Sequence, residues 1–458
     1  MTAGGDLIAT GDIDTIVALA TPPGRGAIAV VRLSGPTAFE IVARHLGSWP
    51  LEPRVSHLCN LTDGDERLDQ ALVTLYPGPN SFTGEDTVEI STHGGYLVPS
   101  SVVAALILSG ARQALPGEFT RRAVINGKLD VLQAEGIGDL VDAKSRAMQR
   151  AALDQLDGGL SRRLLDLRSQ LVGLEALIAY DVDFPDEDDG PIPRERVQQA
   201  TANVVKALAS LLATIPIGEI VREGAVVVIA GPPNAGKSSL FNALLGRSRA
   251  IVTEIPGTTR DALEATVDTG KWPLRLVDTA GLRNTTDQLE RLGIEVSERY
   301  LSAAHVVLAC SENPANLSTI VGEIGRYSRA PILPIRTKSD LVTISDENDL
   351  SAHTIDLSAE TGEGLPQLIA AIDAILDSND DQLEPDSPIL TSARHRKAIE
   401  TAYGETRAFE QIWKAEQLPA TVAAVHLRTA VSALEELIGS VEIEDVLDRV
   451  FSSFCVGK

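Results

Sequence analysis

The sequence predicts a multidomain protein of mixed class, with α/β domains and an α-helical domain. At 458 residues the chain is too long for a single hydrophobic core and implies roughly three domains. The apolar pattern also changes along the chain, from short strand-like runs to helical stripes, then to alternating strands and helices, and back to helix. Two helical blocks that flank an α/β block indicate a doubly wound sheet domain between two parts of a helical domain.

The first domain is predicted over residues 1–128. Short β-like runs such as TIVALA, AIAVVRLSG and TVEIST alternate there with Gly/Pro segments such as TPPGRG and YPGPNSFTGE. Strand-like runs bounded by turn residues are typical of a compact α/β domain.

The helical domain is predicted in two parts, residues 129–220 and 381–458. Spacings of four and three place six apolar residues on one buried face of a long helix: Leu160, Leu164, Leu167, Leu171, Leu174 and Ile178. The acidic stretch DVDFPDEDDGPIP (181–193) reads as a solvated loop. Near the end, a second apolar face runs to Phe451 and Phe454.

The composition excludes several classes of function. With 64 acidic and 40 basic residues the formal charge is −24, so a general electrostatic affinity for nucleic acid is excluded and any RNA contact must be local or shared with a partner. Three cysteines are too few for a disulfide framework or a zinc site. The N-terminus lacks a signal-peptide pattern, no apolar run reaches the roughly 20 residues of a membrane span, and Lys458 does not fit a prenylation box at Cys455. A cytoplasmic protein without a membrane segment is expected.

A phosphate-binding loop is predicted where AVVVIA runs into GPPNAGKSS. The segment fits G-x-x-x-x-G-K-[ST] at Gly231, Gly236, Lys237 and Ser238, between a strand and a helix as the motif requires. The glycines let backbone N–H groups surround phosphates, the lysine supplies a charge, and the serine can ligate magnesium at a helix N-terminus.

Four further motifs follow in the order of a Ras-like GTPase. PGTTRD offers Thr259 to magnesium, and DTAG offers the carboxylate of Asp278 and the backbone of Gly281. TKSD and SAETG each follow a predicted strand. The sequence therefore predicts a doubly wound GTPase domain over residues 221–380.

The residue after DTAG is unusual for a self-sufficient GTPase. Leu282 stands where a glutamine would orient the attacking water, and leucine cannot do so. Asn234, inside the P-loop, has a side-chain carbonyl that could hold a monovalent cation near the phosphates. A local turn bond is the alternative reading of Asn234.

Together these segments closely resemble the MnmE (TrmE) family of tRNA modification GTPases. The resemblance rests on GPPNAGKSS, PGTTRD, DTAGLR followed by LERLGIE, and the terminal FCVGK. In the N-terminal part it rests on ATPPGRGAIAVVRLSG, PGPNSFTGEDTVEISTHGG and LPGEFTRRAVINGKLD, so that it covers nearly the whole chain.

The resemblance implies an N-terminal folate-binding and dimerisation domain, a helical domain and an inserted G domain. It implies a homodimeric, potassium-stimulated GTPase that forms a heterotetramer with the FAD-dependent MnmG (GidA) protein. Together they add an aminomethyl or carboxymethylaminomethyl group to the 5-position of the wobble uridine of certain tRNAs. The carbon donor is a tetrahydrofolate derivative, 5-formyl- or methylene-tetrahydrofolate.

The family's functional residues carry over by motif. The resemblance implies folate contacts at Arg32, Glu89, Lys128 and Lys458, although spacing alone fits ordinary surface charges at Arg32 and Lys128. It also implies potassium ligands at Asn234, Thr253, Ile255 and Thr258, and a catalytic role for Glu290 as general base or water-orienting group, where a solvated helix face is the alternative. It places the C-terminal tail at the folate site, so that Cys455 can act catalytically in one-carbon transfer, with an inert tail as the alternative. The expected GTP contacts are Asn234, Ala235, Gly236, Lys237, Ser238, Ser239, Thr253, Glu254, Ile255, Pro256, Gly257, Thr258, Thr259, Asp278, Thr279, Ala280, Gly281, Thr337, Lys338, Ser339, Asp340, Ser358, Ala359 and Glu360, with Ser238 and Thr259 also binding Mg²⁺.

One motif departs from the family pattern. The guanine-reading sequence Asn-Lys-x-Asp is here Thr337-Lys338-Ser339-Asp340. Asp340 can still accept hydrogen bonds from the guanine N1–H and amino groups, but a threonine hydroxyl replaces an amide. We expect guanine selectivity to survive and Thr337→Asn to tighten nucleotide binding by about 1 kcal/mol.

The rival interpretation is a regulatory RNA-binding GTPase of the ribosome-assembly type, without modification chemistry. Such a protein would need an appended basic RNA-binding module, which this acidic chain lacks.

Overall fold

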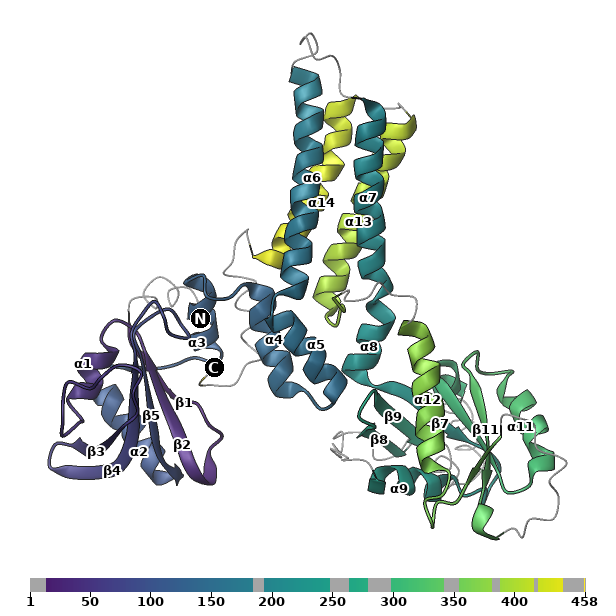
Figure 1. Cartoon of the computed structure of the whole chain (residues 1–458), viewed down its shortest axis with the longest axis horizontal. Coiled ribbons are helices and arrows are strands. Elements are labelled where there is room, and N and C mark those ends of the chain that lie inside the picture. Colours follow the sequence, from purple (N-terminus) through teal and green to yellow (C-terminus); the bar gives the residue numbers. More distant parts are fainter. Residues whose placement is uncertain are drawn as a thin grey trace, which may run out of the picture. The chain divides into compact units, whose positions relative to one another are not determined.

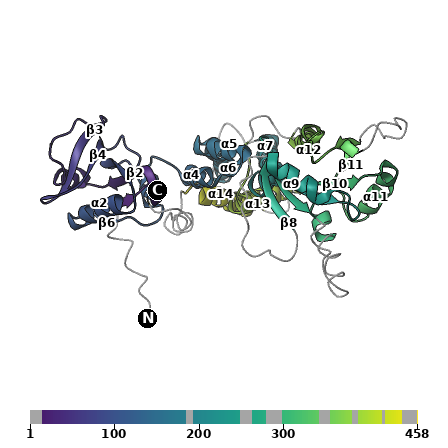
Figure 2. The same cartoon turned by 90° about the horizontal axis from the view of Figure 1, so that it is seen from below.

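The structure is a computed structural model that describes residues 14–183, 193–247, 263–278, 298–341, 354–380, 388–415, 419–439 and 457. The chain divides into two compact units (Figures 1 and 2). The first contains Met1–Gly138 with Glu435–Lys458, and the second contains Asp139–Leu434.

A six-stranded sheet forms the centre of the first unit. Its order is β3-β4-β5-β2-β1-β6, and all neighbours are antiparallel except β1 and β6. The strands are β1 (Ile16–Leu19), β2 (Gly24–Ser34), β3 (His57–Asp63), β4 (Glu66–Tyr76), β5 (Thr87–Gly95) and β6 (Arg112–Gln113). The alternation along β2 buries Val31 and Leu33 on one face and directs Arg32 to the other, as the period of two requires.

Helices cover one face of this sheet. The side chains of α1 (Ala38–Ala43) and α2 (Leu97–Leu108) pack with Val31 and Leu33 in the main core of the unit. On the other face, Phe119 of α3 (Glu118–Ile125) forms a small separate cluster with Ile16 and Ala18. This confirms the predicted α/β character of the N-terminal part.

Long helices dominate one part of the second unit. Figure 1 shows α6 (Gly159–Asp183), α7 (Arg194–Ala213), α13 (Ala393–Ala415) and α14 (Ala420–Ile438) side by side; α14 ends in the first unit, which includes residues from Glu435 on. The shorter helices are α4 (Val131–Asp142), which begins in the first unit, α5 (Arg146–Leu156) and α8 (Ile215–Glu223). All six residues of the predicted stripe on α6 are buried, which confirms their role as bundle core.

The run Arg194–Glu223 is long and apolar enough to cross a membrane by length and composition alone. It combines α7 and α8, and Val197, Val204, Leu208 and Leu211 of α7 are buried within the protein. Core helices of soluble bundles pass the same test, so the run is weak evidence for a membrane span.

A second six-stranded sheet, with the order β12-β11-β10-β7-β9-β8, forms the G domain. Its strands are β7 (Ala225–Ala230), β8 (Leu263–Asp268), β9 (Pro273–Asp278), β10 (Val306–Ser311), β11 (Ile332–Thr337) and β12 (Ile355–Leu357). Helices α9 (Lys237–Arg247) and α12 (Leu365–Asp380) contribute to the core on one face, and α11 (Leu317–Ile324) to the core on the other. The doubly wound fold is therefore confirmed.

One edge strand of this doubly wound sheet departs from the parallel arrangement of the other strands. Strand β8 runs antiparallel to β9, because only residues 269–272 connect them and a parallel pair needs a crossover of a dozen or more residues.

The chain enters and leaves the G domain at neighbouring points. Helix α8 leads into β7, and the backbone at Leu390, just before α13, lies against α8: a Cβ at Gly218 would stand 1.9 Å from the Leu390 carbonyl oxygen. Thr214 also accepts a hydrogen bond from the Leu390 backbone N–H at 3.1 Å. Adjacent ends are what an inserted domain requires.

Candidate functional site

The P-loop begins at the end of the fully buried strand β7. Gly231 has a φ of +153°, and a Cβ there would lie 2.3 Å from the carbonyl oxygen of Cys310 on β10. Gly236 has a φ of +77°, which favours glycine. The two glycines of the motif are therefore required by a close strand approach and by a left-handed turn.

Lys237 and Ser238 lie where the loop becomes helix α9. The Lys237 ammonium donates hydrogen bonds to the carbonyl oxygens of Gly231 (3.0 Å) and Pro232 (2.8 Å), so it lies over the loop. Ser238 Oγ donates to Asp278 Oδ2 at 2.7 Å, and Asp278 is completely buried at the end of β9. The structure thus brings together the predicted hydroxyl and carboxylate, two oxygen groups that suit Mg²⁺.

Asn234 lies at the exposed tip of the same loop with a φ of +62°, in the left-handed region that asparagine tolerates. Its side chain makes no hydrogen bond to any described residue, so the structure gives no support to the alternative of a local turn bond.

The two predicted base-side loops follow β11 and β12. Thr337 ends β11, is 3% exposed, and donates from Oγ1 to the Ala235 carbonyl oxygen of the P-loop at 2.9 Å. Lys338 has a φ of +57° and forms an ion pair with Glu312, while Asp340 is exposed.

Ser358 follows β12 and is fully buried. Its Oγ accepts a hydrogen bond from the backbone N–H of Thr361 at 3.2 Å. This hydrogen bond closes a tight turn that contains Ala359 and Glu360. Since β7, β9, β11 and β12 are parallel, all these groups lie at the carboxyl edge of one sheet, where α/β folds bind ligands.

Several predicted residues lie outside the described part of the chain. They comprise the switch-like segments, the candidate general base and most of the C-terminal tail: Thr253, Glu254, Ile255, Pro256, Gly257, Thr258, Thr259, Thr279, Ala280, Gly281, Leu282, Glu290, Phe451, Phe454, Cys455 and Lys458.

Arg32 and Glu89 form the centre of a second candidate site in the first unit. They are directly opposed on β2 and β5, and Arg32 donates from Nε (3.1 Å) and Nη2 (2.7 Å) to Glu89 Oε1. The guanidinium carbon lies 5.4 Å from the ring centre of Phe82 and 5.7 Å from that of Phe119. The result is a charged pair between aromatic rings on the sheet face opposite α1 and α2.

Lys128 is attached to this site through the loop 77–86 that carries Phe82. Its Nζ donates to the Pro79 carbonyl oxygen at 3.1 Å, and its side chain lies beside Gly84. Asn126 donates to the Thr83 carbonyl oxygen at 2.7 Å. The end of α3 thus holds this loop at two points.

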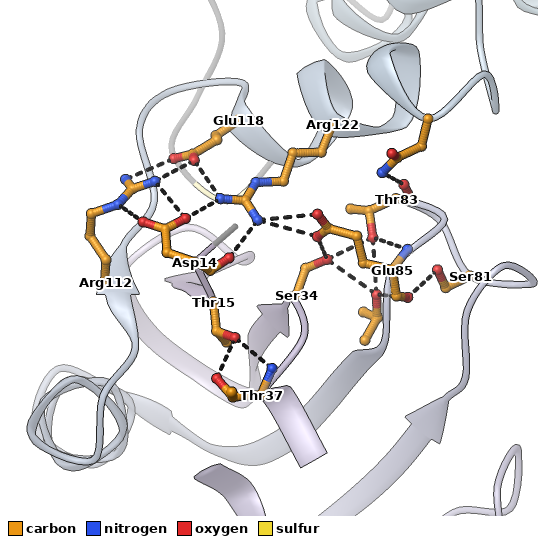
Figure 3. Close-up of polar contacts among 12 residues, drawn as sticks. Asp14, Thr15, Ser34, Thr37, Ser81, Thr83, Glu85, Arg112, Glu118 and Arg122 are labelled. Carbon is orange, nitrogen blue, oxygen red and sulfur yellow. Dashed lines mark hydrogen bonds and ion pairs between the residues drawn. The ribbon is translucent and has the colours of Figure 1, made fainter. Parts of the chain in front are cut away.

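An ion cluster around the buried Arg122 contacts the same loop at Glu85 (Figure 3). Arg122, 3% exposed, donates to Asp14, Glu118 and Glu85 at 2.6, 3.1 and 3.2 Å. Burial raises the pKa of Asp14, but hydrogen bonds from Arg112 and Arg122 outweigh it and hold that pKa below its ordinary value. Figure 3 also shows Ser34 Oγ, which donates to Glu85 at 2.6 Å.

Four residues of this site were not predicted from the sequence: Phe82, Phe119, Glu85 and Arg122. Glu118 and Arg122 are four residues apart in GEFTRR, a spacing that signals a helical ion pair. No signal in the sequence pairs Arg122 with Asp14, 108 positions away.

The C-terminal tail is described at Gly457 alone. A Cβ at Gly457 would lie 2.3 Å from the Leu19 carbonyl oxygen, so this glycine is in contact with the end of β1. Ala18, one residue earlier, is the register partner of Arg32. Gly457 therefore lies against β1, the strand next to the one that carries Arg32.

Comparisons with known proteins cover almost the whole chain. The model of the GTP-binding protein TrmE N-terminus matches residues 15–128, and that of the MnmE helical domain matches residues 131–455. Among solved structures, the G domain of the T. maritima FeoB iron transporter is 28% identical and covers 33% of this chain and 98% of its own, with a TM-score of 0.27.

Two relatives named tRNA modification GTPase MnmE align over nearly their full lengths. The Methylobacterium radiotolerans protein is 43% identical over 98% of this chain and 100% of its own length. The Moorella thermoacetica protein is 40% identical over 97% of this chain and 99% of its own length. The chain therefore belongs to the MnmE (TrmE) family and is a GTP hydrolase involved in tRNA modification.

Proposed function

We propose that this GTPase is stimulated by potassium and works with an FAD-dependent partner, MnmG, on the wobble uridine of certain tRNAs. It helps to add an aminomethyl or carboxymethylaminomethyl group at the 5-position, with a tetrahydrofolate derivative as the carbon donor. The observation that carries the proposal is the presence of two separate sites in one chain: a phosphate-binding edge at β7 and a charged, aromatic surface at Arg32 and Glu89.

The residues of the G domain fit a magnesium-bound nucleotide. The Ser238 hydroxyl would bind Mg²⁺ directly, and the Asp278 carboxylate would lie close to the ion. A bound Mg²⁺ would neutralise charge on the phosphates. Lys237 binds phosphate oxygens as a point charge, and Asp340 accepts from the guanine. Asn234 would hold the potassium ion, with Thr253, Ile255 and Thr258, and Glu290 would orient the attacking water in place of a glutamine.

The first unit fits a folate. The described surface offers a carboxylate at Glu89 for the N–H edge of a pterin, cations at Arg32 and Lys128 for carboxylates, and the exposed ring of Phe82 for stacking. We assign Lys458 to the same surface, and the contact of Gly457 with Leu19 supports this assignment. Cys455 then lies close enough in sequence to act in the transfer of the one-carbon unit.

The proposed domains are residues 1–128 for folate binding and dimerisation, 129–220 and 381–458 for the helical domain, and 221–380 for the G domain. The two family models, which match residues 15–128 and 131–455, support the first boundary. The contact of Gly218 with Leu390 supports the insertion of the G domain.

Complementation tests the whole proposal. A bacterial strain that lacks its MnmE gene but retains MnmG should regain the modified wobble uridine when it expresses this chain, measured by mass spectrometry of digested tRNA. A Ser238→Ala variant serves as the control and should fail to restore it. Absence of the modified base with the soluble, GTP-hydrolysing wild-type chain would contradict the modification function and favour a purely regulatory GTPase.

A further inference from the structure

Thr337 connects the base-reading loop to the phosphate-binding loop. It lies at the end of β11 with only 3% of its surface exposed, and its hydroxyl donates to the Ala235 carbonyl oxygen at 2.9 Å. Its side chain also packs against the P-loop, since a Cβ at Gly236 would lie 3.5 Å from Thr337 Cβ. The two loops are therefore in direct contact at this residue.

The chemistry of a hydroxyl limits what Thr337 can offer to a base. A threonine hydroxyl has one hydrogen to donate, and here that hydrogen is directed at Ala235. Toward any other group its oxygen can only accept. Guanine N7 and O6 are themselves acceptors, so neither can form a hydrogen bond with a hydroxyl whose only hydrogen is already used.

We propose that Thr337 determines how this enzyme reads guanine: it fixes the base-reading loop to the P-loop and leaves the N7 edge of the base without a side-chain donor at this position. This inference rests on the GTP binding of the chain. Side-chain recognition then depends on Asp340, an acceptor that reads the N1–H and amino groups and thus separates guanine from adenine.

An asparagine at position 337 would behave differently. Its amide has two N–H groups, so that one can donate to the Ala235 carbonyl oxygen while the other remains for N7. The difference between threonine and asparagine is thus a specific loss of one donor to the base, rather than a general loosening of the loop.

The test compares GTP with 7-deaza-GTP, in which a C–H group replaces N7. Dissociation constants for both are measured by calorimetry on the full-length wild type and on Thr337→Asn. The wild type should bind the two nucleotides equally within a factor of two. Thr337→Asn should bind GTP about fivefold more tightly than 7-deaza-GTP, as expected for one additional net hydrogen bond.

Two further variants test the connection to the P-loop. Thr337→Val keeps the shape but leaves the buried Ala235 carbonyl oxygen without its donor, so GTP and 7-deaza-GTP should both bind about fivefold more weakly. Thr337→Ser keeps the donor and should restore the affinity for both nucleotides that Thr337→Val loses. Unchanged affinity in Thr337→Val would overturn the structural role of the hydroxyl.

A wild type that binds 7-deaza-GTP at least fivefold more weakly than GTP would overturn the proposal, since a donor would then reach N7. Equal binding of both nucleotides by Thr337→Asn would overturn it as well. Failure of the wild type to bind GTP at all would instead contradict the nucleotide function, so the two failures are distinguishable in the same titration.

Discussion

Arg32 and Glu89 are paired through a single carboxylate oxygen. Both hydrogen bonds from the guanidinium end on Glu89 Oε1, at 3.1 and 2.7 Å, and Oε2 receives no hydrogen bond from the described residues. The pair is partly exposed, with 21% and 30% of the two side chains accessible. Arg32 therefore orients a carboxylate whose second oxygen remains available to a ligand donor.

We expect Glu89→Gln to weaken binding of 5-formyl-tetrahydrofolate by roughly tenfold, because it replaces a charged acceptor, worth about 1.5–3 kcal/mol per hydrogen bond, by a neutral one worth about 1 kcal/mol. GTP turnover should be unchanged. Calorimetry on the full-length protein measures the first, and phosphate release measures the second. Glu66→Gln, at the exposed start of β4, is the matched control. Normal folate affinity in Glu89→Gln would show that Glu89 does not bind the folate.

The regular parts of the fold were predictable because local patterns determine them. The stripe from Leu160 to Ile178 repeats with the helical period, and a single helix places all six of its residues in the bundle core. The P-loop was equally predictable, because its residues are contiguous and their geometry is local.

The rest depends on contacts between distant residues. The pairing of Arg32 with Glu89 requires the register of β2 and β5, and the position of Phe82 requires a loop held by Arg122 through Glu85. The antiparallel edge strand β8 follows from the short connection at 269–272, which the alternation of strands and helices does not reveal. Register and long-range ion pairs have no local period, so the sequence pattern does not predict them.

Potassium should stimulate GTP hydrolysis, and Asn234 should be required for this effect. The Asn234 side chain is exposed and has no hydrogen bond to a described residue, so its carbonyl oxygen can accept a cation. We expect GTP turnover to be at least about tenfold faster in potassium than in sodium. A cation placed where negative charge develops in the transition state typically raises the rate by this factor or more.

Steady-state phosphate release in the two chloride salts measures the effect. Asn234→Ala should hydrolyse GTP at the same slow rate in both salts. Asn242→Ala, on the exposed side of α9, should retain the stimulation. Equal wild-type rates in sodium and potassium would be incompatible with a potassium-dependent mechanism.

His305 should make the stability of the G domain dependent on pH. Its Nδ1 accepts a hydrogen bond from the Val226 backbone N–H at 3.0 Å, at the start of β7. Burial, followed by the nearby charge of Arg275, lowers the His305 pKa below 6.5, although Glu219 and Glu223 act in the opposite direction. Below pH 6.5 the folded protein then binds fewer protons at this site than the unfolded chain. The contribution of His305 to the free energy of unfolding is therefore fully present above pH 6.5 and decreases as the pH falls below it.

The variant His305→Asn separates this effect from other acid-sensitive groups. Its side-chain oxygen can accept from Val226 without titrating, so the decrease in melting temperature between pH 7 and pH 5.5 should be smaller than in the wild type. The two decreases in melting temperature should differ by about 2–4 °C, which corresponds to a loss of about 1 kcal/mol, the worth of one net hydrogen bond. His57→Asn, at the sheet edge of the first unit, is the control. Parallel pH profiles for wild type and His305→Asn would exclude this residue as the cause.

Cys455 is the cysteine we expect to take part in one-carbon transfer. Cys59 and Cys310 are buried and free, and burial raises the pKa of both thiols, that of Cys310 to about 12. A nucleophile needs an accessible thiolate, so these two are unsuitable. Gly457, two residues after Cys455, contacts the end of β1 in the unit that contains Arg32 and Glu89.

Replacement of the thiol should therefore separate the activities of the protein. Cys455→Ser should keep the melting temperature, GTP turnover and folate affinity of the wild type. Its rate of tRNA modification should fall about 10²-fold, the usual effect of losing a nucleophile or an acid–base group. Deletion of residues 456–458 should weaken folate binding as well, because it removes Gly457 from β1 and Lys458 from the proposed folate site. Modified tRNA is quantified by mass spectrometry with the flavoprotein partner present. Full modification by Cys455→Ser would show that the thiol has no chemical role, whatever the deletion does to folate binding.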